Sequence, residues 1–443
     1  MKLSVLPILL ASLISYVPDT RALTLEALFR NAMEKNPHIQ KAKCDVEQAS
    51  GRRLVFRAVA LPNAIIGIAG GVQGGYRHGE KETQPFGFAY GAFTQPLFNA
   101  AIPASRRRGD VEVLIAQQEL NVAVIQQLHT ARIAFYTALY NRSLKQLREK
   151  QRDRLEENAG SQKSRYESGL VDRSTLVGAT VQTRELDPRI EAAQRAYEGA
   201  RLKLAEAMGA DLGAHAEMPT PEDELHYKSV QIDLEEGTVA ALQNRPDLKL
   251  ARLLVRAADE DQRMIEAAYY PAINAAVAGE YIPVSGVRRE SEGSPRRSDD
   301  VISPEVRAGA AYSWRVIDNG RVSGAAAKQG AVRQANELTL RKLETDVPRD
   351  LARIRNELEA IARKETSLAN ASSSAEQAAT TVQENLAAGV VSQLEFRLAE
   401  NALLDIKSAL LGLAYQQQVA LAEWDRARGL YFQFLDDSAR SVQ

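Results

Sequence analysis

The sequence is poor in the residues that build disulfide frameworks and metal centres. Its 443 residues contain one cysteine and five histidines, and the histidines are scattered without the spacing of metal ligands. A single cysteine excludes an intrachain disulfide framework. Signature motifs of common enzyme classes are missing too, since no GxSxG, HExxH, GxxxxGK[ST] or CxxC occurs. We therefore expect no enzyme activity, no cofactor and no metal site.

The chain also lacks an excess of charge of either sign. Its 56 lysines and arginines face 57 aspartates and glutamates, which leaves a formal net charge of −1. A dedicated nucleic-acid binder would show a basic excess, so no nucleic-acid partner is expected. Beyond the N-terminus no run of about 18 apolar residues occurs, so no transmembrane helix is predicted.

The N-terminus has the pattern of an export signal. Lys2 is followed by the apolar run LSVLPILLASLISYV, and Ala22 offers a small residue for cleavage. A basic start, a short apolar segment and a small-residue exit are typical of a secretory signal peptide. The alternative is a first buried helix, which Pro7 and Pro18 disfavour. We assign residues 1–22 to a signal peptide and expect the mature chain to be exported.

The chain contains an internal repeat. A shift of 209 positions superposes residues 25–62 on 234–271 with nine identities, including the proline pair Pro37 and Pro246. Further on the shift becomes 220, because the second copy has a longer polar insertion, and Gly169 then meets Gly389. Such conserved order and spacing indicates duplicated units, and a repeat has to be recognised before any fold is assigned.

These alignments set the predicted organisation. The first repeat spans 23–212, a linker spans 213–232, the second repeat spans 233–430, and a tail spans 431–443. Each repeat begins with a helix of about 35 residues that ends at a proline.

Each repeat then changes to a period of two, which is typical of a β-strand. The hairpins are predicted at about 64–98 and about 272–316. In both copies alternate residues are apolar or aromatic, and the 220 shift places these apolar positions on one another. Strands of roughly 11 residues have the length that a tilted strand needs to cross a bilayer. An ordinary hairpin on a soluble core remains the alternative for these segments alone.

Two sets of strand residues are candidates for opposite environments. Glu305 and Arg307 are expected to face an aqueous lumen. The residues expected to face lipid are Phe86, Phe88, Tyr90, Val306, Ala308, Ala310, Tyr312 and Trp314.

Long helices follow each hairpin, at about 104–209 and about 324–429. Apolar residues recur there in steps of three and four, and about 60 helical residues reach about 90 Å. Gly169 and Gly389 mark a turn in each tract, because glycine suits the left-handed position that ends a helix. Pro188 and Pro348 fall inside the tracts, where we expect them to kink or break the helix.

Four strands per chain cannot cross a membrane alone, because open edges would leave backbone groups unsatisfied in lipid. Several chains would have to pool their strands into one barrel, and their long helices into one tunnel. The expected fold class is therefore mostly α with a transmembrane β-barrel contribution, built from two structural repeats.

Together these features resemble the TolC-like outer-membrane efflux proteins. The resemblance covers essentially the whole mature chain: a signal peptide, NPHI and NRPDL helices, alternating hairpins, QPLFNA with its echo VIDNG, and Gly-centred turns. It implies a homotrimer closed by twelve pooled strands in the outer membrane, with a helical tunnel crossing the periplasm. It also implies the exit duct of a tripartite efflux or type I secretion system, served by an inner-membrane pump and a periplasmic adaptor.

The resemblance also suggests where a gate and a docking site lie. Glu395, six residues after Gly389, matches the main acidic gate position, whereas Leu398 stands where the family's type member has a second acid. Glu395 alternatively acts as an acid at a helix N-terminus, favoured by the helix dipole. The candidate adaptor-docking tips are Gly169, Leu170, Gly389 and Val390, which can also serve as plain helix caps.

The rival hypothesis is an exported coiled-coil scaffold, or a periplasmic adaptor protein without a membrane barrel. It shares the long helices but predicts no apolar strand face exposed to lipid. The sequence does not indicate whether the cargo is a drug, a metal ion or a protein.

Overall fold

The computed structural model describes residues 23–77, 80–210, 218–281 and 305–431. The predicted signal peptide and residues 432–443 of the predicted tail lie outside the described residues. Two compact units divide the chain: unit 1 comprises residues 1–35, 130–229 and 360–419, and unit 2 comprises 36–129, 230–359 and 420–443. Each unit therefore draws on both halves of the sequence.

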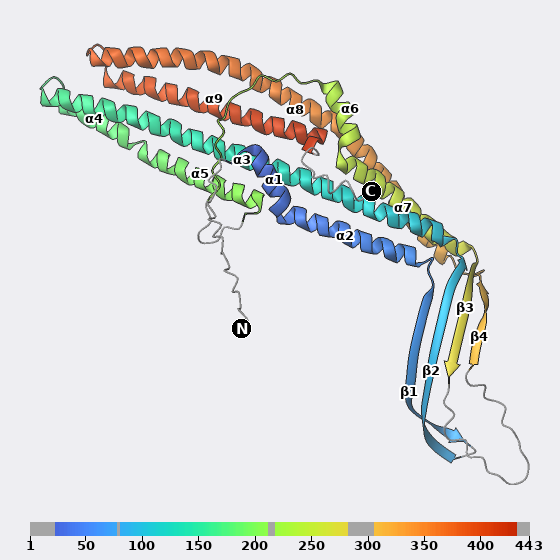
Figure 1. Cartoon of the computed structure of the whole chain (residues 1–443). Helices are drawn as coiled ribbons and strands as arrows, with labels where there is room; N and C mark the ends of the chain where they lie inside the picture. The colour runs from blue at the N-terminus through green and yellow to red at the C-terminus, as the bar shows by residue number, and fades with distance from the viewer. Residues whose placement is uncertain (1–22, 78–79, 211–217, 282–304, 432–443) are drawn as a thin grey trace, which may run out of the picture. The chain divides into compact units, whose positions relative to one another are not determined.

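Both halves of the chain contain two helices, then two strands and then a long helix that is followed by a return, which is divided into two helices in the first half only (Figure 1). The first half contains α1 (Leu25–Lys35), α2 (Pro37–Ala58), β1 (Asn63–Arg77), β2 (Glu80–Phe98), α3 (Ala101–Glu167), α4 (Arg173–Arg184) and α5 (Asp187–Met208). The second contains α6 (Leu234–Asn244), α7 (Pro246–Glu266), the short 3₁₀ helix η1 (Ala267–Tyr269), β3 (Ala272–Tyr281), β4 (Glu305–Ser313), α8 (Arg321–Ala387) and α9 (Gln393–Arg428). The fold is mostly helical with one four-stranded sheet. None of the described helices is long and apolar enough to span a bilayer.

Proline divides the opening helix of each half, which the sequence suggested would be continuous. Pro37 and Pro246 occupy the first positions of α2 and α7, and the residue before each has an extended backbone, with ψ 122° at both Asn36 and Arg245. A proline disfavours helical geometry in the residue before it, so the helix must end and restart there. Asn36 caps the restart, because its side chain accepts a hydrogen bond from the His38 backbone N–H at 2.9 Å.

The two internal prolines of the long tracts behave differently. Pro188 lies in the first turn of α5, after a break that separates α4 from α5. A proline at this position costs little, since the first helical N–H groups have no intrahelical partner. Pro348 lies inside α8, which continues on both sides of it. The expected break therefore occurs at Pro188, whereas α8 is not interrupted at Pro348.

The four strands form one antiparallel sheet in the order β1-β2-β3-β4 (Figure 1). β1 and β2 are paired along 15 residues from Asn63 to Arg77. The register of β2 against β3 shifts between Pro96 and Phe98. β1 and β4 are the two edges of the sheet, and neither has a second strand partner among the described residues.

The register separates two sets of residues that we expected on one face. Tyr90 pairs with Glu280, and Glu280 pairs with Glu305. Residues directly opposite one another on neighbouring strands project from the same face of a sheet. Tyr90, together with Phe86 and Phe88, therefore shares a face with Glu305 and not with Val306. The expectation that these aromatic residues share a face with the apolar residues of β4 is wrong.

The physical reason is the parity of the register. The offset from Tyr90 through Glu280 to Glu305 is 215 residues, an odd number, whereas the repeat alignment uses 220, an even number. Because the side-chain period of a strand is two, an odd difference moves every side chain to the other face.

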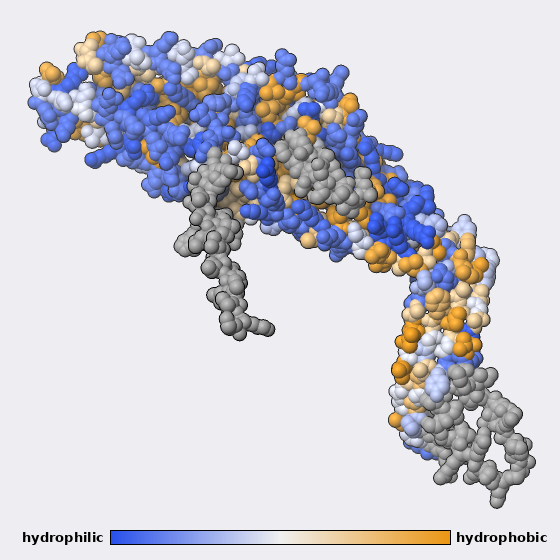
Figure 2. All heavy atoms as spheres, viewed as in Figure 1, coloured by the Kyte–Doolittle hydropathy of each residue, from blue (hydrophilic) through white to orange (hydrophobic). Residues whose placement is uncertain are grey.

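We name the two faces by their residues. The aromatic face carries Phe86, Phe88, Tyr90, Glu280, Glu305 and Arg307. The aliphatic face carries Ile66, Ile68, Val72, Val277, Val306, Ala308, Ala310 and Tyr312. Figure 2 shows apolar residues gathered over the strands, whereas the helices expose mostly polar ones. Trp314 follows the last residue of β4, and its indole N–H donates to the Tyr269 carbonyl at 3.0 Å.

Unit 1 is held together by an apolar core and by a strap of irregular chain. Phe135 of α3, Leu204 of α5 and Leu28 of α1 are fully buried in one cluster. Residues 218–228 lack regular structure, and their carbonyl groups accept hydrogen bonds from helical side chains. Arg142 donates to the carbonyl of Asp223 at 2.7 Å, and Arg201 donates to that of Pro219 at 3.0 Å. Guanidinium groups thereby satisfy backbone acceptors that no helix or strand provides for.

In unit 2, α3 is joined to its neighbours by small apolar residues and by ion pairs. Val111 and Ile115 of α3 pack with Ala257 of α7. Arg108 lies 3.0 Å from Asp261 of α7 and 2.6 Å from Glu112, and Arg107 lies 2.7 Å from Glu260. These pairs fix α7 against α3 next to the start of the sheet.

A glycine-to-alanine pair tests the packing in unit 2. An added Cβ at Gly237 of α6 would lie 2.8 Å from the buried Trp424 ring. An added Cβ at Gly199 of α5 would have no atom within 4 Å, apart from its own helix backbone and chain neighbours. We expect Gly237→Ala to lower stability, since overpacking costs about 1–3 kcal/mol. The control Gly199→Ala should gain up to about 1 kcal/mol of helix propensity. Thermal unfolding followed by circular dichroism measures both, and equal midpoints would contradict the close packing.

Candidate functional site

The two Gly-centred turns of unit 1 have the same backbone geometry. Gly169 and Gly389 adopt left-handed φ values of 75° and 77°. After each glycine the next residue donates its N–H back to the helix, from Leu170 to the Arg165 carbonyl at 2.8 Å and from Val390 to the Asn385 carbonyl at 2.9 Å. This 6→1 bond is the Schellman motif, in which a residue at positive φ ends the helix. Both predicted turn glycines are therefore helix C-caps.

The helix that follows each turn is capped by a different side chain. In the first turn Asp172 accepts hydrogen bonds from the Thr175 backbone N–H at 3.0 Å and from the Ser174 hydroxyl at 2.6 Å. Hydrogen bonds from Ser174 and Thr175 lower the pKa of Asp172 to about 2. In the second turn Ser392 and Glu395 form a reciprocal pair. The Ser392 N–H donates to the Glu395 carboxylate at 2.8 Å, and the Glu395 N–H donates to the Ser392 hydroxyl at 3.3 Å.

The Ser392–Glu395 arrangement is a capping box, which satisfies two backbone donors that the helix leaves free. The predicted gate residue Glu395 thus has a structural task at the start of α9. Its role in a gate stays a prediction.

Apolar side chains are strongly exposed at both turns. Leu170 is 71% exposed and Val390 is 73% exposed. Leu394 and Leu398, one helical turn apart on α9, are 63% and 61% exposed. Large contiguous apolar patches on a protein surface mark interaction sites, so the exposed apolar residues of the turns make them a candidate docking surface.

Behind the turns, three polar contacts join the first-half helices to the second-half helices within unit 1. Arg165 donates to the Leu386 carbonyl at 2.9 Å. Arg397 lies 2.9 Å from Glu185, and Arg154 lies 3.0 Å from Glu400. An apolar cluster lies among them, formed by Leu155, Leu186, Leu386 and Phe396. The two turns are therefore held by a shared set of contacts.

Glu400 is a buried charge that the sequence analysis did not single out. Its side chain is 1% exposed, and burial raises its pKa against the opposing effect of Arg154 and Lys407. The sequence contains a pattern that indicates this burial, because Glu400 falls at helical spacing from the buried residues Phe396 and Leu403. A charged residue on the apolar stripe of a helix indicates a buried ion pair.

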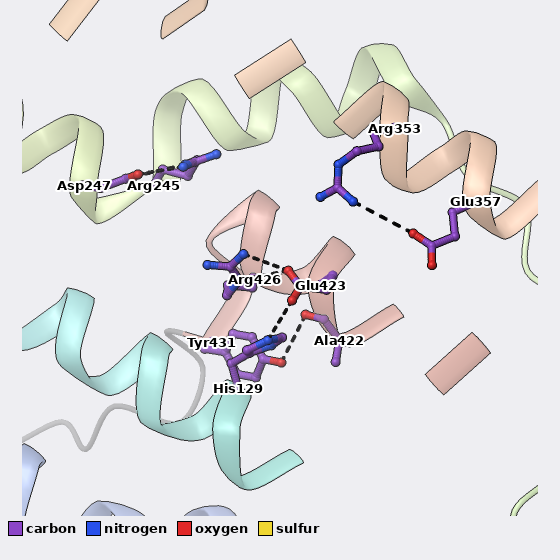
Figure 3. Close-up of polar contacts among 9 residues, drawn as sticks. All are labelled: His129, Arg245, Asp247, Arg353, Glu357, Ala422, Glu423, Arg426 and Tyr431. Atoms are coloured by element: carbon purple, nitrogen blue, oxygen red, sulfur yellow. Dashed lines mark hydrogen bonds and ion pairs between the residues drawn. The ribbon is translucent and has the colours of Figure 1, made fainter. Parts of the chain in front are cut away.

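A second missed cluster lies in unit 2 around His129 of α3 (Figure 3). His129 is 5% exposed, and its Nε2 lies 3.1 Å from Glu423 of α9. Arg426 donates to the same carboxylate at 2.8 Å. The hydrogen bond from His129, assisted by the one from Arg426, lowers the pKa of Glu423 to about 2, although partial burial opposes this shift.

On the sheet, the predicted lumen residues Glu305 and Arg307 form a bidentate pair, one contact of which is 2.9 Å long. Glu280 belongs to the same face and pairs with Tyr90 across the strands. Among the described residues there is no cluster of three or more histidine, cysteine or acidic residues that could hold a metal ion.

The fold is that of outer-membrane channels. The CmeC outer membrane channel of Campylobacter jejuni is similar over 94% of this chain and 88% of its own, with TM-score 0.77 and 12% identity. VceC, an outer membrane protein of Vibrio cholerae, is similar over 91% and 96%, with TM-score 0.75 and 17% identity. The MtrE outer membrane channel of Neisseria gonorrhoeae, solved in its open state, is similar over 91% and 88%, with TM-score 0.73 and 17% identity.

Residues 238–430 match the family model described as outer membrane efflux protein. A comparison with the sequences of curated proteins found no match. The chain thus matches the outer membrane efflux protein family over residues 238–430 and has the fold of TolC-like channels, which confirms the resemblance drawn from the sequence.

The His129–Glu423 pair generates a prediction about acid stability. Because the pKa of Glu423 in the fold is below its ordinary value of 4.5, the pair stabilises the fold above about pH 4.5, and this contribution falls as pH drops toward 2. Glu423→Gln should cost about 1 kcal/mol at pH 7, a figure already reduced for the partial exposure of the pair.

The measurement is thermal unfolding of wild type and variant at pH 7 and pH 3. The gap between their midpoints, about 1–2 °C at pH 7, should shrink at pH 3. Glu206→Gln, at an exposed position of α5, serves as the control and should change neither midpoint. A gap that is as large at pH 3 as at pH 7 would rule out the ionised Glu423 carboxylate as its cause.

Proposed function

We propose that three copies of this chain form the outer-membrane exit duct of a tripartite efflux or type I secretion system. The observation that carries the proposal is the sheet: its two edge strands are unpartnered among the described residues, and one of its faces is apolar and exposed. In lipid every backbone polar group has to be satisfied within the protein, so an open sheet can cross a membrane only by closing with other strands.

The exposure of the aliphatic face supports a lipid environment. Ile66 is 89% exposed, Ile68 is 86% exposed and Val306 is 71% exposed. A soluble scaffold or adaptor would bury such a face against its own core. The opposite face carries Glu305 and Arg307, whose charges are costly in lipid and suit an aqueous lumen.

The lengths of the elements fit the same proposal. β3 and β4, with 10 and 9 residues, have about the 9–11 residues that a tilted strand needs to cross a bilayer. β1 and β2, with 15 and 19 residues, exceed this minimum and are longer than the roughly 11 residues expected from the sequence. α3 and α8 have 67 residues each, which corresponds to about 100 Å of helix. Helices of this length, continuing from the strands, suit a tunnel across the periplasm.

The Gly169 and Gly389 turns are the proposed contact with a periplasmic adaptor, which connects the duct to an inner-membrane pump. Their exposed apolar residues Leu170 and Val390 support this assignment. The duct itself is passive: it conducts substrates that the pump and adaptor deliver, without a bound cofactor and without a reaction.

The first test is the native mass of the protein extracted from purified outer membranes in mild detergent, together with two matched variants. Ala310 and Ala311 are neighbours on β4, are both exposed, and belong to the aliphatic and the aromatic face respectively. Wild type should be a trimer. Ala310→Lys should lower the yield of membrane-inserted trimer, because a lysine on the lipid face costs about 2–4 kcal/mol at mid-bilayer.

Ala311→Lys is the control, and its trimer yield should stay close to that of wild type. A wild-type protein found as a soluble periplasmic monomer or dimer would overturn the duct and favour the exported scaffold. A trimer sensitive to Ala311→Lys but not to Ala310→Lys would reverse the assignment of the two faces.

A pair of variants at Glu395 separates gating from helix capping. Both Glu395→Gln and Glu395→Ala remove a carboxylate, but glutamine keeps an oxygen that can accept the Ser392 N–H. If three Glu395 carboxylates line the mouth, both variants should reduce the preference of the pore for cations over anions. The reversal potential across a planar bilayer under a salt gradient measures this preference. Unchanged selectivity in Glu395→Gln, with a changed pore only in Glu395→Ala, would leave Glu395 as a capping residue alone.

A further inference from the structure

The aromatic face carries a ladder of rings along β2. The ring centroids of Phe86 and Phe88 are 6.3 Å apart, and those of Phe88 and Tyr90 are 5.9 Å apart. The three residues alternate along one strand, so the rings form a continuous aromatic surface parallel to its direction. Both centroid separations are within the range of favourable aromatic pairs.

The rings extend over glycines of the neighbouring strand. Gly71 pairs with Phe86, and Gly67 pairs with Tyr90. A Cβ on Gly67 would lie 2.4 Å from the Tyr90 ring, and one on Gly71 would lie 3.0 Å from the Phe86 ring. The absence of side chains on β1 therefore lets these rings rest against its backbone. Their outward sides stay accessible, with Phe86 39% exposed and Tyr90 42% exposed.

Negative charge lies beside the end of the ladder. Glu280 and Glu305 follow Tyr90 in one row across three strands, and Arg307 is engaged with Glu305. Two carboxylates and one guanidinium leave a local charge of −1. A cavity of about 180 Å³ lies here, and its lining includes Tyr90, Ala92, Glu280, Glu305 and Arg307.

We propose that Tyr90, the adjoining aromatic ladder and Glu280 form a binding site for planar aromatic cations inside the lumen. The inference rests on the proposed function, because only closure of the barrel turns the aromatic face into a lumen wall. Ring faces attract both flat aromatic molecules and cations, and the excess carboxylate adds charge complementarity. A hydrated metal ion would gain nothing from the rings, so the site favours organic cargo.

The test is block of the pore by ethidium, a planar aromatic cation, in a planar lipid bilayer. Tyr90→Leu and Glu280→Gln should each raise the half-blocking concentration of ethidium, by about tenfold for the ring, which is within the range of single stacking contacts. Tyr90→Phe keeps the ring, so ethidium should block this variant at the same concentration as wild type. Tyr312→Leu makes the same substitution on the aliphatic face and should have no effect.

Tetraethylammonium, a cation without a ring, is the probe control, and its block should be weak and insensitive to Tyr90→Leu. Equal ethidium block of wild type and Tyr90→Leu, in pores that conduct normally, would overturn the site and leave the duct intact. Absence of any wild-type conductance would instead count against the duct. In that case ethidium fluorescence with detergent-solubilised protein decides, and equal binding to wild type and Tyr90→Leu again overturns the site.

Discussion

The open edges of the sheet are the constraint on which the proposed assembly depends. β1 and β4 each present a row of backbone N–H and C=O groups that lack a partner strand among the described residues. In water such groups are hydrated, but in lipid they must be paired. In the proposed membrane setting, closure with further copies would satisfy the unpaired edges and place the exposed aliphatic side chains against lipid. The proposed closure would also bring the long helices of the copies together, because α3 and α8 each begin within about ten residues after a strand.

The duplicated turns show how one backbone requirement is met by different side chains. Gly169 and Gly389 differ by 2° in φ, and the residue after each donates the same Schellman bond. The following helix is nevertheless capped by Asp172 in one turn and by Ser392 with Glu395 in the other. Position 395 therefore carries an acid for a reason that is local to its helix. If Glu395 also acts in a gate, its side chain has a second role beside capping α9. An acid at this position is therefore no evidence for a gate by itself.

Local patterns in the sequence predicted the kinds of elements well, because their causes are local. The period of two in 86–98 and 305–313 reflects strand pleating, and the glycines at 169 and 389 reflect a left-handed turn. The face of each strand could not be predicted in this way. It depends on the register of β2 against β3, which is set between residues almost 200 positions apart. The partners of the buried residues Glu400 and His129 could not be predicted for the same reason, since they come from other helices.

The corrected faces also explain the composition of β1, whose sequence NAIIGIAGGVQGGYR alternates apolar residues with small ones. The aliphatic residues Ile66 and Ile68 project to one side, while Gly67 and Gly71 project to the other and leave room for the rings of Tyr90 and Phe86. Glycine weakens a strand, because it costs backbone entropy and contributes no packing of its own. Here neighbouring rings supply that packing. β1 is thus aliphatic toward one face, whereas at Gly67 and Gly71 it contributes no side chain to the other. At those positions the rings of Tyr90 and Phe86 determine the surface of the second face.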